Sequence, residues 1–172
     1  LKVKRMMDEL LANIKDLTDE EEIADYLGKI ITKDAGDGSG LIYGFGHAIY
    51  TLSDPRAKIL KKNAKKLSAE KGMTDIYEFY KRVEKLVPSV FENVKGSKKV
   101  ICANVDFYSG FVYDMLGIES DLFTPLFAVS RIAGWCAHRI EEITYGGRII
   151  RPAYRSMVKP TGYVPLDERT AD

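Results

Sequence analysis

The sequence predicts an all-α protein, and three observations lead to that prediction. Apolar residues recur every three or four positions along most of the 172-residue chain, which is the spacing of amphipathic helices. Residues that typically start and stop helices bracket these periodic stretches. Only one short run, 100–105, is rich enough in apolar and β-branched residues to form an extended segment.

The first two predicted helices follow from spacing and capping. In 6–14 the apolar residues occupy one helix face, with polar residues between them. Thr18 and Glu21 form a capping-box pattern, which predicts that a second helix starts there and continues to Ile31. Three glycines in 34–40 predict that this helix ends in a loop.

Two further helices are predicted on either side of Gly72. The first begins at Asp54-Pro55, because proline fits the first turn of a helix. It carries five lysines around its polar side, which we interpret as a solvated face. The second begins at Thr74, and Pro88 within its pattern predicts a kink or an early stop, since proline has no N–H to donate.

The C-terminal part is predicted to contain two more helices and an irregular tail. One helix covers 107–116, with Gly117 just past its end. The other covers 121–142 and has the longest apolar pattern in the chain. The tail, 145–172, has three prolines and little periodic apolar pattern, so we expect it to pack on another surface, such as a second copy of the chain.

Composition and charge exclude several classes of protein. Lys and Arg total 26 and Asp and Glu total 25, and this net charge of +1 removes the electrostatic argument for a nucleic-acid partner. Charges interrupt every apolar run before it reaches the roughly 20 residues of a membrane span, so no membrane partner is expected. Cys102 and Cys136 form no CxxC pair, which indicates a reducing, cytoplasmic setting and no metal site. Because the chain begins with Leu1 rather than Met, we expect it to be a piece of a longer protein.

The two histidines differ in context. His47 follows the glycine turn 44–46, where the backbone can approach a ligand closely and an imidazole can donate a hydrogen bond or exchange a proton. The same pattern suits a histidine that only caps or packs, and so short a glycine motif does not decide between these alternatives. His138 lies within the longest helix and is predicted to be structural or half-buried.

Asp106 and three arginines are further candidates. Asp106 stands where an apolar run meets a helix, and spacing alone favours a helix N-cap. The alternative is a general base, partly desolvated by its apolar neighbours. Arg56, Arg131 and Arg151 stand in apolar or proline-restrained contexts, and we expect Arg131 to be buried because its helix otherwise has the pattern of a core helix. A buried guanidinium needs an anion. That anion is either an internal carboxylate or a small carboxylate substrate.

Four motifs together resemble the citrate synthase family, in that family's order, over nearly the whole chain from Leu41 onward. They are Gly44-Phe45-Gly46-His47-Ala48-Ile49-Tyr50 with Asp54-Pro55-Arg56, Asn104-Val105-Asp106-Phe107-Tyr108-Ser109-Gly110, the segment 122–135, and Arg148-Ile149-Ile150-Arg151-Pro152 with Tyr163-Val164-Pro165. The resemblance is to bacterial, Firmicutes-type members. It implies a small helical domain at 1–117, and the last helix and tail of a large domain at 118–172.

The resemblance also implies roles for the candidates. His47 would hydrogen-bond the carbonyl of oxaloacetate, and Asp106 would remove the methyl proton of acetyl-CoA. Arg56 and Arg131 would bind the carboxylates of oxaloacetate, in one cleft with His47 and Asp106. Arg151 would reach the active site of the partner subunit in a homodimer. Phe127 would shape the pocket, and Gly44, Phe45, Gly46 and Ala48 would border the adenine of coenzyme A.

The reaction implied is the condensation of acetyl-CoA with oxaloacetate and hydrolysis to citrate and CoA, with CoA as cosubstrate and no permanently bound cofactor. The family uses a second catalytic histidine whose motif these residues lack, and His138 has the wrong context to replace it. We therefore expect the isolated chain to be inactive. Two alternatives stay open: a 2-methylcitrate synthase, which takes propionyl-CoA, and a non-catalytic helical interaction module of the same fold.

Overall fold

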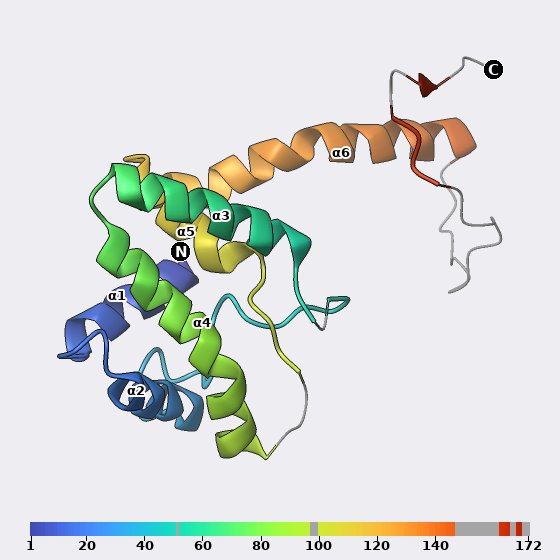
Figure 1. Cartoon of the computed structure of the whole chain (residues 1–172). Coiled ribbons are helices and arrows are strands. Elements are labelled where there is room, and N and C mark those ends of the chain that lie inside the picture. Colours follow the sequence, from blue (N-terminus) through green and yellow to red (C-terminus); the bar gives the residue numbers. More distant parts are fainter. Residues whose placement is uncertain (51, 97–99, 147–161, 166–167, 170–172) are drawn as a thin grey trace. The chain divides into compact units, whose positions relative to one another are not determined.

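The computed structural model describes residues 1–50, 52–96, 100–146, 162–165 and 168–169, and it confirms the all-α prediction. The chain forms two compact units, Leu1–Ser130 and Arg131–Asp172. The domain division at 117/118 stays a prediction. The helices are α1 (Lys2–Asn13), α2 (Glu20–Thr32), α3 (Pro55–Glu70), α4 (Thr74–Lys95), α5 (Val105–Met115), the short 3-10 helix η1 (Ser120–Leu122) and α6 (Phe123–Tyr145) (Figure 1).

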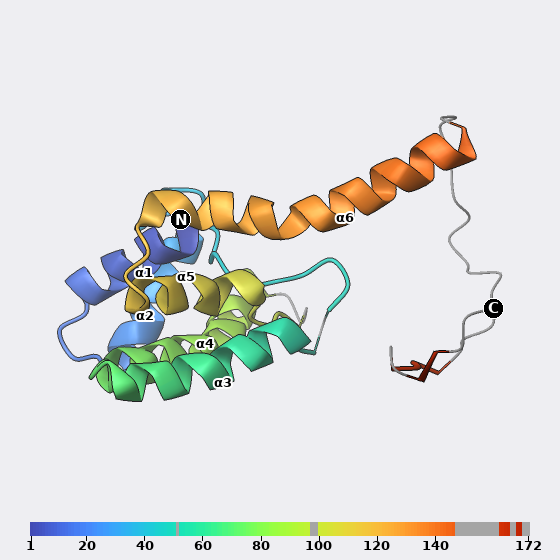
Figure 2. The same cartoon turned by 90° about the horizontal axis from the view of Figure 1, so that it is seen from above.

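Within the first unit, the helices pack in two groups, one around α5 and one around α4, and α3 belongs to both. Helix α5 contacts α3 and α1, while α4 contacts α2 and α3. Figure 2 shows α3 alongside α4 and α5. None of the helices in the part of the chain that the structure describes is both long and apolar enough to cross a membrane.

The cap of α2 differs from the prediction. Asp19, not Thr18, is the N-cap residue, and its Oδ1 accepts hydrogen bonds from the backbone N–H groups of Glu21 and Glu22 at 2.9 and 3.2 Å. Thr18 instead donates both its N–H and its hydroxyl to Asp16. The predicted start of the helix was therefore one residue early, because the hydrogen bonds of Thr18 are made to Asp16 and not to the helix.

Helix α4 continues through Pro88, so of the two predicted outcomes, a kink or an early stop, the early stop is wrong. Pro88 lies on the exposed side of the helix, whereas Val83, Val87 and Val90 are buried on the opposite side. An interior proline costs an α-helix about 3 kcal/mol. Burial of three valines, at roughly 1.5 kcal/mol or more each, offsets that cost. Helix α4 therefore continues to Lys95 and ends at Gly96, whose φ is +63°.

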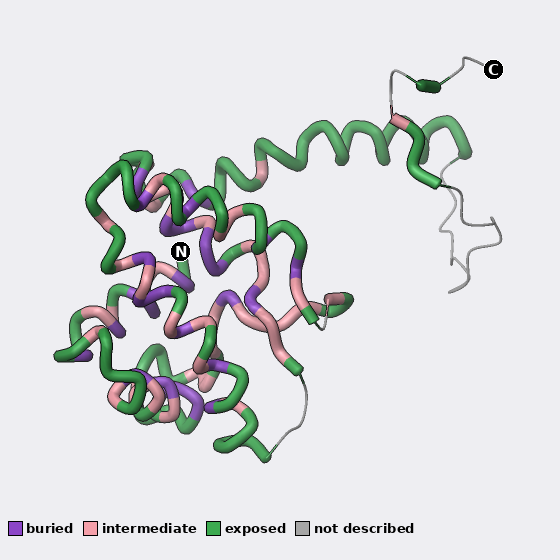
Figure 3. The backbone as a smooth tube through the Cα atoms, viewed as in Figure 1, coloured by how far each residue is buried: buried purple, intermediate pink, exposed green. Residues whose placement is uncertain are grey.

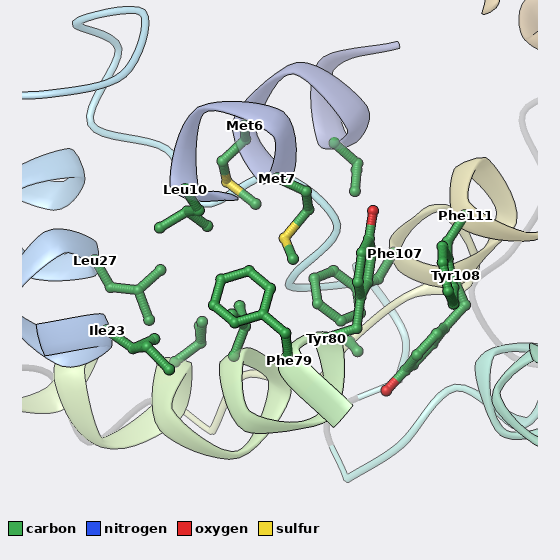
Figure 4. Close-up of a cluster of buried hydrophobic side chains, with 14 of the residues drawn as sticks. Met6, Met7, Leu10, Ile23, Leu27, Phe79, Tyr80, Phe107, Tyr108 and Phe111 are labelled. Atoms are coloured by element: carbon green, nitrogen blue, oxygen red, sulfur yellow. The ribbon is translucent and has the colours of Figure 1, made fainter. Parts of the chain in front are cut away.

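The core of the first unit lies where α1, α2, α4 and α5 meet. Figure 4 shows side chains from all four helices in contact, and Figure 3 shows the buried residues along their inner faces. The Tyr80 ring stacks on Phe111 with 4.7 Å between centroids, and burial raises the pKa of the Tyr80 hydroxyl. The labelled core residues are Met6, Met7, Leu10, Ile23, Leu27, Phe79, Tyr80, Phe107, Tyr108 and Phe111.

Replacing Phe79 with Ala is expected to lower the free energy of unfolding by about 3–5 kcal/mol, because the side chain is fully buried and its loss leaves a cavity. Urea denaturation followed by circular dichroism measures the change. Ile59→Ala is the control, since Ile59 is 63% exposed on α3 and its loss should change stability by about 0.5 kcal/mol or less. Equal losses for the two variants would contradict the position of the core.

Helix α6 exposes most of its apolar side chains. Phe123 is buried and its ring lies 5.0 Å from that of Tyr113, but Trp135 and Ile140 are 58% and 65% exposed. The expectation that Arg131 lies buried in a core helix is wrong, because Arg131 is exposed. His138 is likewise not half-buried, since its side chain is 83% exposed. Most of the described residues of α6 are exposed (Figure 3).

Candidate active site

Two segments far apart in sequence, 44–46 and 102–104, are hydrogen-bonded to each other. The Asn104 N–H donates to the Gly44 carbonyl at 2.8 Å, and the Gly46 N–H donates to the Cys102 carbonyl at 2.9 Å. Phe45 and Ala103 form an isolated antiparallel bridge, so the extended segment predicted at 100–105 is confined to this short pairing. His47 directly follows the first of these segments, and α5 begins directly after the second. The pairing therefore places the two motifs next to each other.

Glycine is required at position 44. Its φ is +85°, and a Cβ there would lie 3.0 Å from both the Cα and the Cβ of Phe107. The neighbouring Phe45 ring contacts the Phe107 ring edge-on, with 4.8 Å between centroids. The absence of a side chain thus lets the loop that carries His47 rest directly on the first turn of α5.

Gly44→Ala is expected to destabilise the chain by about 2–4 kcal/mol, from backbone strain at positive φ plus overlap with Phe107. Gly46→Ala is a matched control, because Gly46 has nearly the same φ, +84°, but a Cβ there would meet nothing within 4 Å. It should cost only the strain, about 1–2 kcal/mol. Thermal and urea unfolding of both variants measure the difference. If Gly46→Ala costs as much as Gly44→Ala, close packing on Phe107 is not what requires the glycine.

The hydrogen bonds of His47 fix which ring nitrogen carries the proton. Its Nδ1 accepts from the backbone N–H groups of Ile49 and Tyr50 at 3.0 and 3.2 Å. In a neutral imidazole the other nitrogen, Nε2, must then be the N–H donor. Nε2 lies 3.3 Å from Nη2 of Arg56, which is also a donor. Two adjacent donors can both be satisfied by a shared acceptor, such as a carbonyl or carboxylate oxygen.

Asp54 is the buried acidic residue of this region. It is 1% exposed and caps α3, accepting the Arg56 N–H at 2.9 Å. Its carboxylate also accepts from the Arg56 guanidinium, at 3.0 Å from Nε and 2.8 Å from Nη2, and from the Val105 N–H at 3.2 Å. The hydrogen bonds from Arg56 outweigh burial and hold the pKa of Asp54 below its ordinary value.

This depressed pKa gives the stability of the chain a predictable pH dependence. The stabilisation by the Asp54 carboxylate is present above the unfolded-state pKa of about 3.9 and is lost as the pH falls through the lower folded-state value. The difference in unfolding free energy between the wild type and Asp54→Asn should therefore be constant near neutral pH and shrink below about pH 4. Urea denaturation at a series of pH values measures it. A difference that persists unchanged at the acid end would contradict a role for the charge.

Asp106 does not cap α5, so the N-cap role that spacing alone favoured is wrong. Asn104 is the N-cap, and its side-chain oxygen accepts the Asp106 N–H at 2.9 Å. Asp106 is exposed in the first turn, whereas Phe107 and Tyr108 point into the core. The expected desolvation by neighbouring residues is therefore also wrong. The pKa of Arg56 is raised mainly by hydrogen bonding to Asp54 and, to a smaller degree, by the charge of Asp106.

A cavity of about 250 Å³ lies beside Asp106. Besides Asp106, its walls include Phe127 and Tyr113, so two of the predicted site residues, Asp106 and Phe127, share it. His47 and Arg56 are not among the residues that line it. The remaining lining residues are Leu1, Val3, Ser109, Gly110, Phe123 and Thr124.

Other predicted site residues lie elsewhere. Ala48 is exposed next to His47, and Arg131 belongs to the second unit. Arg151 lies outside the described residues. Asp54 was predicted only as a helix start, and Asn104 had no predicted role of its own. The signal for Asp54 was available, since an acidic residue two positions before a candidate arginine can bond its guanidinium.

Comparison with known proteins gives consistent matches. The family model "Citrate synthase, C-terminal domain" matches residues 2–153. A citrate synthase of Synechocystis is 39% identical over 163 residues, covering 94% of this chain and 38% of the relative. Citrate synthase 2 of Bacillus subtilis is 45% identical over 130 residues, covering 74% and 32%. A 2-methylcitrate synthase of Shewanella oneidensis is 38% identical over 158 residues, covering 91% and 38%.

A solved structure agrees with these matches. It is the ternary complex of carboxymethyl coenzyme A and oxaloacetate with citrate synthase from the archaeon Thermoplasma acidophilum, with a TM-score of 0.64 and 33% identity, covering 98% of this chain and 42% of that one. The chain spans about two-fifths or less of the length of these relatives. The family model extends over most of the residues, including both the His47 and the Asp106 motifs, and the chain therefore belongs to the citrate synthase family.

Proposed function

We propose that this chain forms part of the active site of a citrate synthase, which condenses acetyl-CoA with oxaloacetate and hydrolyses citryl-CoA to citrate and CoA. The observation that carries the proposal is the pairing of 44–46 with 102–104, which brings the segment with His47 and Arg56 to the start of α5, the helix whose first turn carries Asp106. The family to which the chain belongs supports it. The Thermoplasma relative binds oxaloacetate and a coenzyme A analogue, which supports the same two substrates here.

Oxaloacetate is the ligand that suits the two adjacent donors, Nε2 of His47 and Nη2 of Arg56. Its ketone oxygen would accept from Nε2 of His47, and the carbonyl would become more electrophilic as the imidazole stabilises the developing oxyanion. Arg56 would bind a carboxylate of the same molecule through the donors that Asp54 does not use. Arg131 and, from the partner subunit of a homodimer, Arg151 would bind the remaining carboxylate oxygens.

Asp106 is proposed as the general base for acetyl-CoA. Because Asn104 caps α5, the Asp106 carboxylate is not used for capping and can accept the methyl proton. The adjacent cavity, with Phe127 in its wall, would hold the acyl group. Coenzyme A would enter as a cosubstrate, with its adenine against Gly44, Phe45, Gly46 and Ala48, and no cofactor would be permanently bound. The enzyme would work in the cytoplasm.

The test is an assay of thiol release from acetyl-CoA in the presence of oxaloacetate, on a full-length protein that carries this sequence. We expect turnover, and we expect Arg56→Ala to raise the KM for oxaloacetate about 100-fold, since a hydrogen bond to a charged group contributes roughly 1.5–3 kcal/mol. Arg82→Ala is the control, because the Arg82 guanidinium donates to the Leu17 carbonyl, in the segment between α1 and α2. A full-length protein that folds but releases no thiol would favour the non-catalytic interaction module.

A 2-methylcitrate synthase is a second candidate, favoured by the match to the Shewanella enzyme. Propionyl-CoA is one methylene larger than acetyl-CoA. Such a group changes selectivity by only about 1–3 kcal/mol, so the two acyl donors need direct comparison. The same assay with propionyl-CoA decides, since the larger kcat/KM identifies the preferred substrate.

A further inference from the structure

We propose that Asp54 is a positioning residue for the site: its buried carboxylate holds the Arg56 guanidinium against His47 and joins the start of α3 to the start of α5, which carries Asp106. The proposal deepens the proposed function and rests on it for the identity of the ligand, oxaloacetate. The geometry on which it depends is independent of the ligand.

Each oxygen of the Asp54 carboxylate accepts two hydrogen bonds. Oδ1 accepts from the backbone N–H and from Nε of Arg56, and Oδ2 accepts from Nη2 of Arg56 and from the Val105 N–H. The Asp54 side chain is 0% exposed, whereas that of Arg56 is 43% exposed. The carboxylate thus makes its four hydrogen bonds inside the protein, whereas the guanidinium that it holds is partly exposed to solvent.

This arrangement fixes the orientation of Arg56. Two of its five N–H groups, on Nε and Nη2, point at Asp54 in the forked geometry that a carboxylate favours. The plane of the guanidinium is thereby set, and Nη2 also lies 3.3 Å from Nε2 of His47. A ligand oxygen that meets both donors finds them already in place, with no long side chain left to order on binding.

The same carboxylate also fixes the start of α5. The Val105 N–H belongs to the residue before Asp106, and it donates to Asp54 rather than to solvent. One buried group therefore locates both the arginine that would bind oxaloacetate and the helix turn that would supply the base. Loss of the charge should affect the two together.

Capping alone does not account for this residue. An N-cap needs one oxygen for one or two backbone N–H groups, and Asn serves as well as Asp. Asp19 at the start of α2 shows the simple case, because among the described residues it accepts from the backbone N–H groups of Glu21 and Glu22 and from no guanidinium. At Asp54 an Asn could keep the cap, but its NH₂ group would face Nη2 of Arg56 and the Val105 N–H, which are both donors.

The enzymatic test compares Asp54→Asn with Asp19→Asn in the full-length enzyme, together with Arg56→Ala and the double variant. Asp54→Asn should raise the KM for oxaloacetate about 10- to 100-fold, and Asp19→Asn should leave it within about twofold. In the Arg56→Ala background, Asp54→Asn should raise this KM no further, because it acts through the arginine. A full additional increase in that background would overturn the proposal, since it would mean a general effect on the fold.

A second test needs no substrate. In the 172-residue chain with ¹⁵N-labelled arginine, the Nε–H signal of Arg56 is identified by its loss in Arg56→Lys. Its exchange with solvent should be slow in the wild type and in Asp19→Asn and fast in Asp54→Asn. Equal protection in all three would overturn the proposal. If the full-length enzyme shows no turnover at all, the proposed function fails, and this exchange comparison alone decides whether Asp54 holds Arg56.

Discussion

Asp106→Asn in the full-length enzyme is expected to lower kcat about 10²- to 10⁴-fold, the usual contribution of a positioned general base. The variant removes the proton acceptor but keeps the size of the side chain. It also keeps the helix, because Asn104 rather than Asp106 caps α5. The KM for oxaloacetate should therefore stay near the wild-type value. Steady-state kinetics with both substrates measures the two effects separately.

The control is Asp114→Asn, the same substitution near the other end of α5. Asp114 pairs with Lys4 at 3.0 Å and is not among the residues that line the cavity beside Asp106. We expect its kcat to stay within about threefold of the wild type, since surface substitutions away from a site have small effects. If Asp106→Asn also keeps nearly full kcat, Asp106 is not the base and is only an exposed carboxylate in the first turn of α5.

The sequence predicted the helices best where the signals are local. The start of α3 follows from Asp54-Pro55, because both the cap and the fixed φ of proline act within one turn. The end of α4 could not be predicted in this way. It depends on Val87 and Val90, whose burial against other helices keeps the segment helical beyond Pro88. Local chemistry favoured a stop there, and tertiary packing overcame it.

For the candidate site too, local signals were predictable from the sequence and tertiary contacts were not. His47 and Asp106 were predicted as site residues from their motifs, but nothing in either motif indicates that 44–46 pairs with 102–104. The role of Asp54 depends on that fold, since the Val105 N–H is 51 positions away along the chain. The burial expected for Arg131 was wrong because an apolar pattern indicates that a helix has an apolar face, but not what covers it.

A polypeptide limited to these 172 residues is expected to form citrate at least 10²- to 10³-fold more slowly than a full-length enzyme, which is the loss measured when one preorganised donor to an oxyanion is removed. Condensation needs a base for the methyl proton and, separately, a donor that stabilises the resulting enolate. Asp106 would supply the base. The family's second catalytic histidine, which would supply the donor, has no counterpart motif in these residues.

His138 is the remaining imidazole, and its surroundings do not suit that task. Its side chain is 83% exposed, and its Nδ1 lies 3.7 Å from Glu141 on the same helix, so water competes for any hydrogen bond that it makes. The chain spans only 38% of the length of the Synechocystis enzyme, and in a full-length protein the remaining residues would supply walls that exclude water from the site. The measurement is thiol release from acetyl-CoA with oxaloacetate, on the 172-residue chain and on the full-length enzyme at equal concentration. Binding of oxaloacetate through His47 and Arg56 should persist weakly in the short chain, because anion recognition does not need the missing donor. Comparable turnover by the two proteins would contradict the prediction, and loss of that turnover in His138→Ala would then identify His138 as catalytic.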